Sequence, residues 1–186
     1  AVDDIAVMEG LTPDRPVAGV FHDGVESGPA GVGLKLFHLA RPIPLSQRVP
    51  MLEDLGLRVI DEQTHEVRKA DGPVVFVHDM DLERADGAPF DLAVTAAPAL
   101  ATFMAVWYGA AESDGFNALT VNAGLPWRDV ALVRAIARYL RQSGTPLTQH
   151  YMWATLNRHA SIAACLPVLF RHRLQPDAVD AAAAEA

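Results

Sequence analysis

Residues 34–68, LKLFHLARPIPLSQRVPMLEDLGLRVIDEQTHEVR, contain a strand, a helix and a second strand in succession. The segment 33–40 carries apolar residues on both faces of an extended chain, which predicts a central strand. Leucine and valine then recur at helical spacing over residues 45–55. Ser46 is a candidate N-cap for this helix, and Gly56 is well placed to end it. The extended remainder of the segment predicts the second strand.

The same pattern continues on both sides of this segment. Residues 74–82 follow a turn and place apolar side chains on one face, which predicts an antiparallel partner for the preceding strand. A helix over residues 90–109, beginning near Pro98, should come next. This order predicts an α+β fold, an ACT-like or ferredoxin-like antiparallel sheet with helices on one face. Two candidates for the remaining strand stay open, residues 118–124 and residues 16–22.

The chain becomes helical after residue 115, so an all-helical segment is expected to follow the sandwich. Glycine, proline and polar breaks separate four predicted helices, at 115–123, 126–142, 146–158 and 161–174. The predicted organisation is a poorly specified lead-in at 1–15, an ACT-like module at 16–112, a helical segment at 113–175 and a linker-like tail at 176–186.

Composition excludes several classes of function. The 186 residues carry a formal net charge of -8 and a pI of about 5.2, which argues against nucleic acid or an anionic membrane as the partner. No apolar run approaches the length that spans a bilayer, and the N-terminus is not a signal peptide, so a cytoplasmic protein is expected. The single cysteine, Cys165, lies in an apolar run and is predicted to be a buried structural thiol rather than a nucleophile.

Motifs for nucleotide binding and hydrolysis are absent from the sequence. The glycine-rich residues 24–33 lack a phosphate-binding lysine and lead into a strand, which is the wrong context for a phosphate loop. His38 and His78 lie on predicted neighbouring strands, and together with Asp79 they could form a small catalytic or metal site. The more ordinary interpretation is that these histidines are hydrogen-bonded strand residues. No catalytic, cofactor-binding or metal-binding residue is therefore assigned.

The helix predicted over residues 126–142 is amphipathic. Its predicted apolar face contains Leu132, Val133, Ile136, Tyr139 and Leu140. Arg134, Arg138 and Arg141 are predicted on the opposite side, where they form a candidate docking stripe that could bind a phosphate or carboxylate or dock on an acidic partner. The alternative is a solvated face with no partner.

Three motifs occur in a fixed order within residues 33–174: PLSQRVPMLEDLGLRV at 44–59, DGFN at 114–117 and ARYLRQ at 137–142. In this combination the chain resembles the large NAD-specific glutamate dehydrogenases of bacteria. The resemblance implies that the chain is a fragment of the non-catalytic N-terminal portion, namely an ACT-like module and a helical segment ahead of the catalytic domain.

The resemblance also implies the activity and partners of the parent enzyme. That enzyme would oxidise L-glutamate to 2-oxoglutarate and ammonia with NAD, and this part would bind no cofactor itself. Its partners would be neighbouring domains and subunits of a homo-oligomer. ACT modules often bind amino acids near the loop between the first strand and the first helix, which makes Arg41, Pro44 and Ser46 candidate effector-loop residues. A free-standing amino-acid sensor is the alternative to a regulatory or assembly module.

Overall fold

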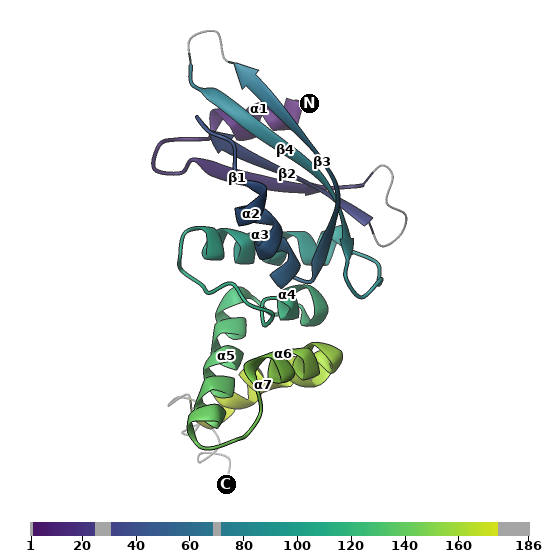
Figure 1. Cartoon of the computed structure of the whole chain (residues 1–186), viewed down its shortest axis with the longest axis vertical. Coiled ribbons are helices and arrows are strands. Elements are labelled where there is room, and N and C mark those ends of the chain that lie inside the picture. Colours follow the sequence, from purple (N-terminus) through teal and green to yellow (C-terminus); the bar gives the residue numbers. More distant parts are fainter. Residues whose placement is uncertain (1, 25–30, 69–71, 175–186) are drawn as a thin grey trace, which may run out of the picture.

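The computed structural model of the chain describes residues 2–24, 31–68 and 72–174 (Figure 1). Within these residues, four antiparallel strands form a sheet in the order β1-β2-β4-β3. The strands are β1 Val17–His22, β2 Gly31–Leu39, β3 Leu57–Arg68 and β4 Val74–Arg84. The predicted tail at 176–186 and most of the glycine-rich residues 24–33 lie outside the described residues.

Helices α2 and α3 pack on one face of this sheet. Helix α2 spans Leu45–Asp54 and helix α3 spans Leu92–Trp107. Their inner side chains and the facing side of the strands form the main hydrophobic core, which includes Leu34, Leu36, Leu52, Leu55, Met80, Leu82 and Phe103. The predicted ACT-like α+β class, followed by a helical part, is confirmed.

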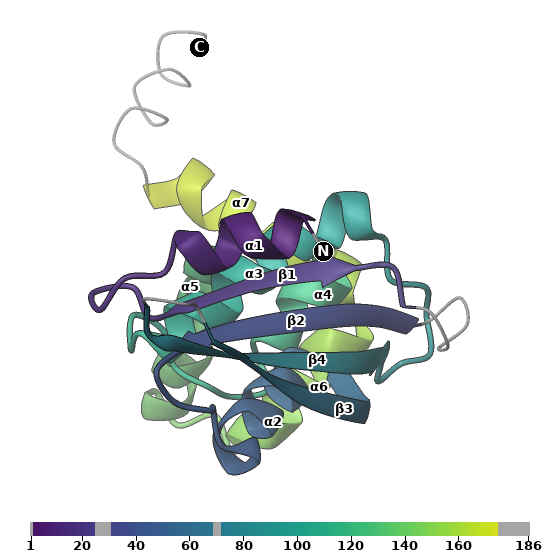
Figure 2. The same cartoon turned by 90° about the horizontal axis from the view of Figure 1, so that it is seen from above.

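A further helix, α1 at Val2–Glu9, lies against the opposite face of the sheet, beside β1 in Figure 2. Met8 packs there with Phe37 and Val75 in a second apolar cluster. The sequence predicted only a poorly specified lead-in over residues 1–15, so this helix is a correction. A helix this short is marginal by itself in water, and packing on the sheet stabilises it.

The uncertain edge strand is β1. It pairs antiparallel with β2, with Val17 opposite His38 and His22 opposite Gly33. The other candidate, residues 118–124, was wrong, because residues 118–123 form helix α4. This short segment contains β-branched residues, but its contacts with neighbouring helices override that local preference.

The two helices of the sandwich begin differently from the sequence expectation. Pro44 occupies the N-cap position of α2 without a side-chain hydrogen bond, so Ser46 lies inside the helix rather than capping it. Helix α3 begins before Pro98, because the Asp91 carboxylate accepts a hydrogen bond from the Ala93 amide at 2.9 Å. The predicted end of α2 is correct, since Gly56 follows it with a φ of 80°.

The rest of the described chain is helical and lies below the sandwich in Figure 1. Its helices are α4 Ala118–Ala123, α5 Trp127–Gln142, α6 Gln149–Arg158 and α7 Ala160–Leu174. A separate apolar cluster holds them together, including Phe116, Leu119, Val130, Val133, Met152 and Ala163. The four predicted helices are thus present, with shifts of a few residues at their ends.

Helix α4 joins this helical segment to the sandwich. The hydroxyl groups of Thr102 and Thr120 form a buried hydrogen bond of 3.0 Å between α3 and α4. Arg84 on β4 donates to the side-chain oxygen of Asn122 at 3.1 Å. Gly56 lies directly against α4, where a Cβ atom on this glycine would come within 3.1 Å of the Ala118 Cβ. The junction therefore depends on close backbone approach as well as on hydrogen bonds.

Substitution of Gly56 tests this junction, and Gly87 is the matched control. Both glycines have a left-handed φ, 80° and 73°, so alanine should cost about 1–2 kcal/mol at either position. At Gly56 the added Cβ also meets α4, and we expect a further loss of about 1 kcal/mol. Urea unfolding of Gly56→Ala and Gly87→Ala measures the difference. Equal losses would show that α4 does not constrain Gly56.

Candidate functional site

The candidate effector loop connects β2 to α2. The side chains of Arg41, Pro44 and Ser46 are all exposed, whereas Ile43 between them is buried. The Ile43 amide donates a 2.9 Å hydrogen bond to Nε2 of His78, and its carbonyl accepts one from Arg48. The middle of the loop is therefore held by its own protein contacts.

A polar cluster built on the buried side chains of Arg48 and His78 lies beneath this loop. It contains Arg48 from α2, Glu62 and Thr64 from β3, and His78 from β4. Arg48 forms a salt bridge with Glu62, and Thr64 donates to the same carboxylate at 2.7 Å. Nδ1 of His78 lies 2.9 Å from the Thr64 hydroxyl. The cluster thus ties the loop, the helix and two strands together.

These contacts determine the protonation of His78. Because Nε2 accepts the Ile43 N–H, Nδ1 must carry the proton and donate to Thr64 or Glu62, which makes the ring neutral. Burial lowers the pKa of His78, Arg48 lowers it further, and Glu62 offsets only part of this effect. Burial alone would raise the pKa of Glu62, but the hydrogen bonds from Arg48 and Thr64 lower it overall. The cluster is an ion pair beside a neutral histidine.

The constellation of His38, His78 and Asp79 does not assemble. Asp79 lies on the other face of the sheet, where it contacts His22 at 3.1 Å and Lys35 at 3.8 Å. Successive strand residues point to opposite faces, so His78 and Asp79 cannot share a site. His38 instead packs edge-on against Trp107. Among the described residues, no group of three His, Cys, Asp or Glu side chains could hold a metal ion.

A second buried polar cluster centres on Arg134 of α5. Its guanidinium donates to the Asp114 carboxylate at 2.8 and 2.9 Å and to the Asn117 side-chain oxygen at 2.7 Å. The Asn117 amide group donates to the Glu112 carbonyl at 2.8 Å, and Gln149 of α6 donates to Asp114 at 3.2 Å. This Arg134 cluster fixes the turn before α4 to both following helices.

The predicted docking stripe must be corrected at Arg134. This side chain is only 3% exposed, and it belongs to the buried face of α5 with Val130, Val133 and Ala137. Their spacing of i, i+3, i+4 and i+7 is that of a helix face directed at a core. Tyr139, predicted to be in the apolar face, is 68% exposed.

The two remaining arginines of the stripe are on the surface. Arg138 pairs with Glu112, with one nitrogen–oxygen distance of 2.7 Å, and this pair is about half exposed. Arg141 is exposed and lies near Gln142 and Gln149 in a shallow hollow. Docking by Arg138 and Arg141 remains a prediction, whereas Arg134 has a structural role.

The DGFN motif also explains the packing around Gly115. A Cβ atom there would lie 2.7 Å from the Trp153 indole nitrogen, so only glycine fits without movement of the ring. The Gly115 carbonyl accepts from Asn157 of α6 at 2.8 Å, and Asn157 accepts from Asn122 at 3.0 Å. The motif is visible in the sequence, but the roles of Asp114 and Asn117 as partners of Arg134 were not predicted from it. The signal in the sequence that could have revealed these roles was the charged residue Arg134, whose spacing places it on the same face of α5 as Val130 and Val133.

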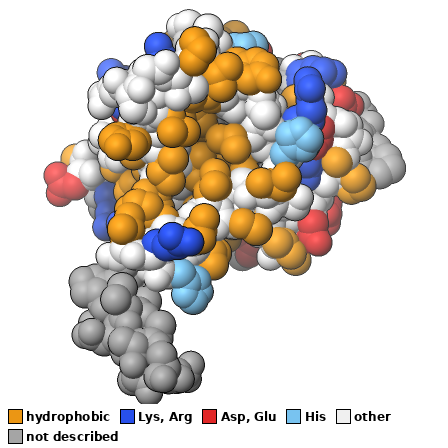
Figure 3. Space-filling view, turned by 90° about the horizontal axis from the view of Figure 1, so that it is seen from below, with side chains coloured by type: hydrophobic (Ala, Val, Ile, Leu, Met, Phe, Trp, Pro, Cys, Tyr) orange, Lys and Arg blue, Asp and Glu red, His pale blue; other side chains and the backbone are white. Residues whose placement is uncertain are grey.

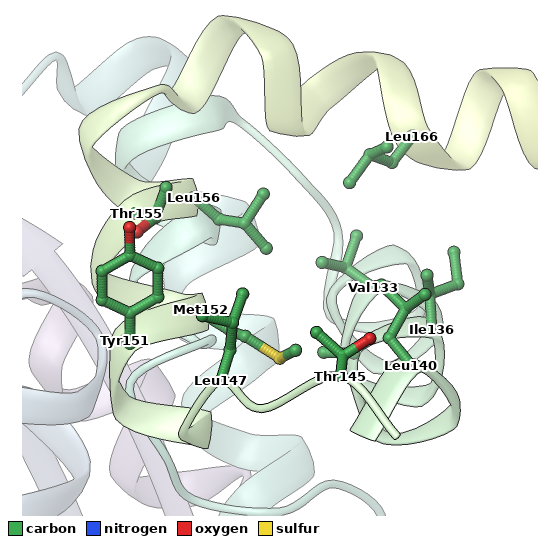
Figure 4. Close-up of a pocket in the computed structure, with 11 residues that line it drawn as sticks. Val133, Ile136, Leu140, Thr145, Leu147, Tyr151, Met152, Thr155, Leu156 and Leu166 are labelled. Carbon is green, nitrogen blue, oxygen red and sulfur yellow. The ribbon is translucent and has the colours of Figure 1, made fainter. Parts of the chain in front are cut away.

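The end of the molecule farthest from the sheet carries an apolar hollow. Figure 3 shows hydrophobic side chains gathered over this face, and Figure 4 shows the hollow between α5, α6 and α7. It has a volume of about 260 Å³ and is lined by residues that include Ile136, Leu140, Leu147, Tyr151, Leu156 and Leu166. The hollow was not predicted from the sequence.

Cys165 on α7 is exposed, which corrects the prediction of a buried thiol. Helix α7 has buried positions at Ala163 and Pro167, and Cys165 falls between them on another side. No helix within residues 2–174 that the structure describes is long and apolar enough to cross a membrane.

Comparison with known proteins explains why a sandwich and a helical segment occur together. Residues 16–95 match the family described as the glutamate dehydrogenase ACT3 domain, and residues 111–176 match glutamate dehydrogenase helical motif 3. The chain belongs to the glutamate dehydrogenase family. The resemblance predicted from the three sequence motifs is confirmed.

The similarity to known proteins extends over nearly the whole chain. It is 40% identical over 176 residues to an NAD-specific glutamate dehydrogenase of Halomonas elongata, covering 95% of this chain. The corresponding proteins of Pseudomonas aeruginosa and Mycobacterium tuberculosis are 37% and 38% identical, over 93% and 95% of the chain. The chain spans 11% of the length of each of these relatives. The similarity thus concerns one region of much longer proteins.

Substitution of Arg134 tests the importance of the Arg134 cluster. Arg134→Ala leaves Asp114 and Asn117 without their guanidinium partner, and loss of one member of a buried pair costs about 3–5 kcal/mol. Arg141→Ala, on the same helix, is the control and should change the free energy of unfolding by about 0.5 kcal/mol or less. Chemical unfolding measures both. Similar losses for the two variants would contradict a structural role specific to Arg134.

The free energy of unfolding should fall as the pH decreases from 7 to 5. Burial lowers the pKa values of His38 and His78 below 6.5 in the folded protein, so the unfolded chain takes up protons first. The stabilisation is complete above pH 6.5 and declines below it, by at most about 1.4 kcal/mol per pH unit for each histidine. Urea unfolding at several pH values measures this slope.

His78→Gln should reduce that slope, because glutamine does not titrate and its amide oxygen can accept the Ile43 N–H. His65→Gln makes the same substitution at an exposed position of β3 and is the matched control for it. An unchanged slope in His78→Gln would rule out the proposed contribution of this residue.

Proposed function

We propose that the chain is a non-catalytic regulatory or assembly module of a large NAD-dependent glutamate dehydrogenase. Its relatives carry the name NAD-specific glutamate dehydrogenase, and the two matched regions are an ACT3 domain and helical motif 3. The complete polypeptide then oxidises L-glutamate to 2-oxoglutarate and ammonia in the cytoplasm. This part holds neighbouring domains and subunits in position.

The main support for this proposal is the junction between the two matched regions. The buried Thr102–Thr120 hydrogen bond joins α3 to α4, and further hydrogen bonds lead from β4 through Asn122 and Asn157 to the turn at Gly115. Contacts of this kind make the sandwich and the helical segment one body. A rigid body of two modules is suited to positioning other domains at both of its ends.

The glycine-rich stretch of this chain lacks the context of a Rossmann-type NAD site. Such a site has a glycine-rich turn between a parallel strand and the N-terminus of a helix. Here Gly31 and Gly33 lie within β2 of an antiparallel sheet. We therefore assign NAD binding to the remainder of the complete polypeptide.

The alternative, a free-standing amino-acid sensor at the loop of Arg41, Pro44 and Ser46, has less support. The backbone of this loop at Ile43 is already bonded to His78 and Arg48. An effector would have to bind the three exposed side chains alone, or displace these buried contacts.

Two activity measurements test the proposed function. The complete polypeptide should form NADH from glutamate and NAD, and the purified chain of residues 1–186 should not. NADH formation by the purified chain would contradict a non-catalytic role. Absence of turnover by the complete polypeptide would contradict the proposed parent activity.

Thermal unfolding separates the module from the sensor. A ligand at 100 times its dissociation constant adds about 2.7 kcal/mol, which should raise the midpoint by roughly 5–10 °C for a chain of this size. We expect no such increase with the standard amino acids, 2-oxoglutarate or NAD. An increase with one amino acid that Ser46→Trp abolishes would favour the sensor.

A further inference from the structure

The apolar hollow is an unfilled extension of the core of the helical segment. Met152 belongs both to the buried cluster of this segment and to the wall of the hollow. Around it, Leu140 is 43% exposed, Leu147 is 40% exposed and Tyr151 is 55% exposed. In Figure 4 these side chains surround an open space between α5, α6 and α7. Gathered apolar side chains of this kind mark interaction surfaces.

The hollow does not have the character of an effector site. Its polar lining groups are the hydroxyls of Thr145, Tyr151 and Thr155, and no charged side chain is part of its wall. An amino acid has both an ammonium and a carboxylate group, which need charged or well-placed polar partners. Its volume of about 260 Å³ is suited to one or two apolar side chains inserted from a protein surface.

The charge of the helical segment indicates which side chains flank the inserted apolar residues on the partner. Residues 111–176 contain seven arginines and three carboxylates, a net charge of +4, in a chain whose net charge is -8. Arg134, Arg138 and Arg171 are paired with carboxylates. Within the described part of the chain, no carboxylate pairs with Arg141 or Arg158. Arg141 directly follows Leu140 of the wall, and Arg158 comes three positions after Thr155 and seven after Tyr151, which places it on the same side of α6 as these two lining residues. An acidic partner would complement this surface.

The partner is most simply supplied by the same polypeptide. The chain spans 11% of its relatives, so most of such a polypeptide lies outside these 186 residues. A segment of the same polypeptide binds intramolecularly, at an effective concentration that reaches about millimolar when the linker is short, so a small hollow suffices to hold it. A separate protein would need a larger interface, of about 1,000 Å² or more.

We propose that the hollow between α5, α6 and α7 receives an acidic amphipathic helix from a part of the same polypeptide outside residues 1–186. This proposal rests on the proposed function. One or two apolar side chains of this helix fill the hollow. Its acidic side chains lie near Arg141 and Arg158. Helix-in-groove docking of this type uses apolar residues at i, i+3 and i+4 as anchors.

Hydrogen exchange in the complete polypeptide and in the isolated chain tests this proposal. Amides of α6 and α7 should exchange about tenfold more slowly or better in the complete polypeptide. Leu140→Glu should abolish most of this protection and expose one acidic helical segment elsewhere in the polypeptide. Val94→Glu, which changes a 66% exposed apolar residue on α3, is the matched control and should leave the protection intact. The double variant Arg141→Glu, Arg158→Glu should weaken the protection as well.

Each outcome of the hydrogen-exchange experiment distinguishes between possible occupants of the hollow. Equal exchange in the isolated chain and the complete polypeptide overturns the proposal. Protection in the isolated chain that increases with protein concentration identifies a second copy as the occupant, and also overturns it. Protection that is insensitive to the arginine reversals overturns the acidic character of the helix. Turnover of glutamate by the complete polypeptide, measured on the same samples, tests the proposed function separately.

Discussion

The arrangement of the helical segment depends on the hydrogen bonds and the ion pair that the buried guanidinium of Arg134 makes. The guanidinium satisfies Asp114 and Asn117 in the turn before α4, and the same carboxylate reaches Gln149 of α6. A charge without partners in this position would be expensive, so the turn and the two helices must adopt positions that supply them. Because α4 packs on the sandwich, this geometry is transmitted to the whole module.

The sandwich uses a second buried arginine in a similar way. Arg48 bonds the carbonyl of Ile43 in the loop that precedes its own helix, and it pairs with Glu62 on the neighbouring strand. Arg134 likewise reaches a backbone carbonyl, that of Glu112, in the turn before the helical segment. In both modules an arginine on a helix thus holds the connection that leads into helical structure. A guanidinium presents five donors in a fixed planar fork, so it can bond a carboxylate and a carbonyl in set directions at once, whereas the ammonium of lysine has three donors and no such fixed geometry.

Most of the architecture could be predicted from the sequence, because the spacing of apolar residues indicates whether a segment is a helix or a strand and which of its faces is buried. Strand, helix and strand from residue 34 onward followed directly from that pattern. The errors occurred where contacts distant in sequence decide the outcome. Helix α1 depends on packing on the sheet, and α4 depends on its contacts with α3. Arg134 was assigned to the surface because it is spaced with Arg138 and Arg141, opposite an apolar face that was taken to include Tyr139. The face that is buried instead contains Val130, Val133 and Ala137, and Arg134 belongs to it.

A module with these junctions is expected to act on its neighbours by position. Internal movement would have to break the Arg134 cluster or the Thr102–Thr120 contact, and both are buried. Breaking either one leaves polar groups without hydrogen-bond partners in a region of low dielectric constant. The free-energy cost of this is larger than the stabilisation that new surface contacts would provide. A signal that passed through this chain would therefore be a displacement of the sandwich and the helical segment together. The surfaces that can change are then those at its ends, the loop of Arg41 and the hollow between α5, α6 and α7.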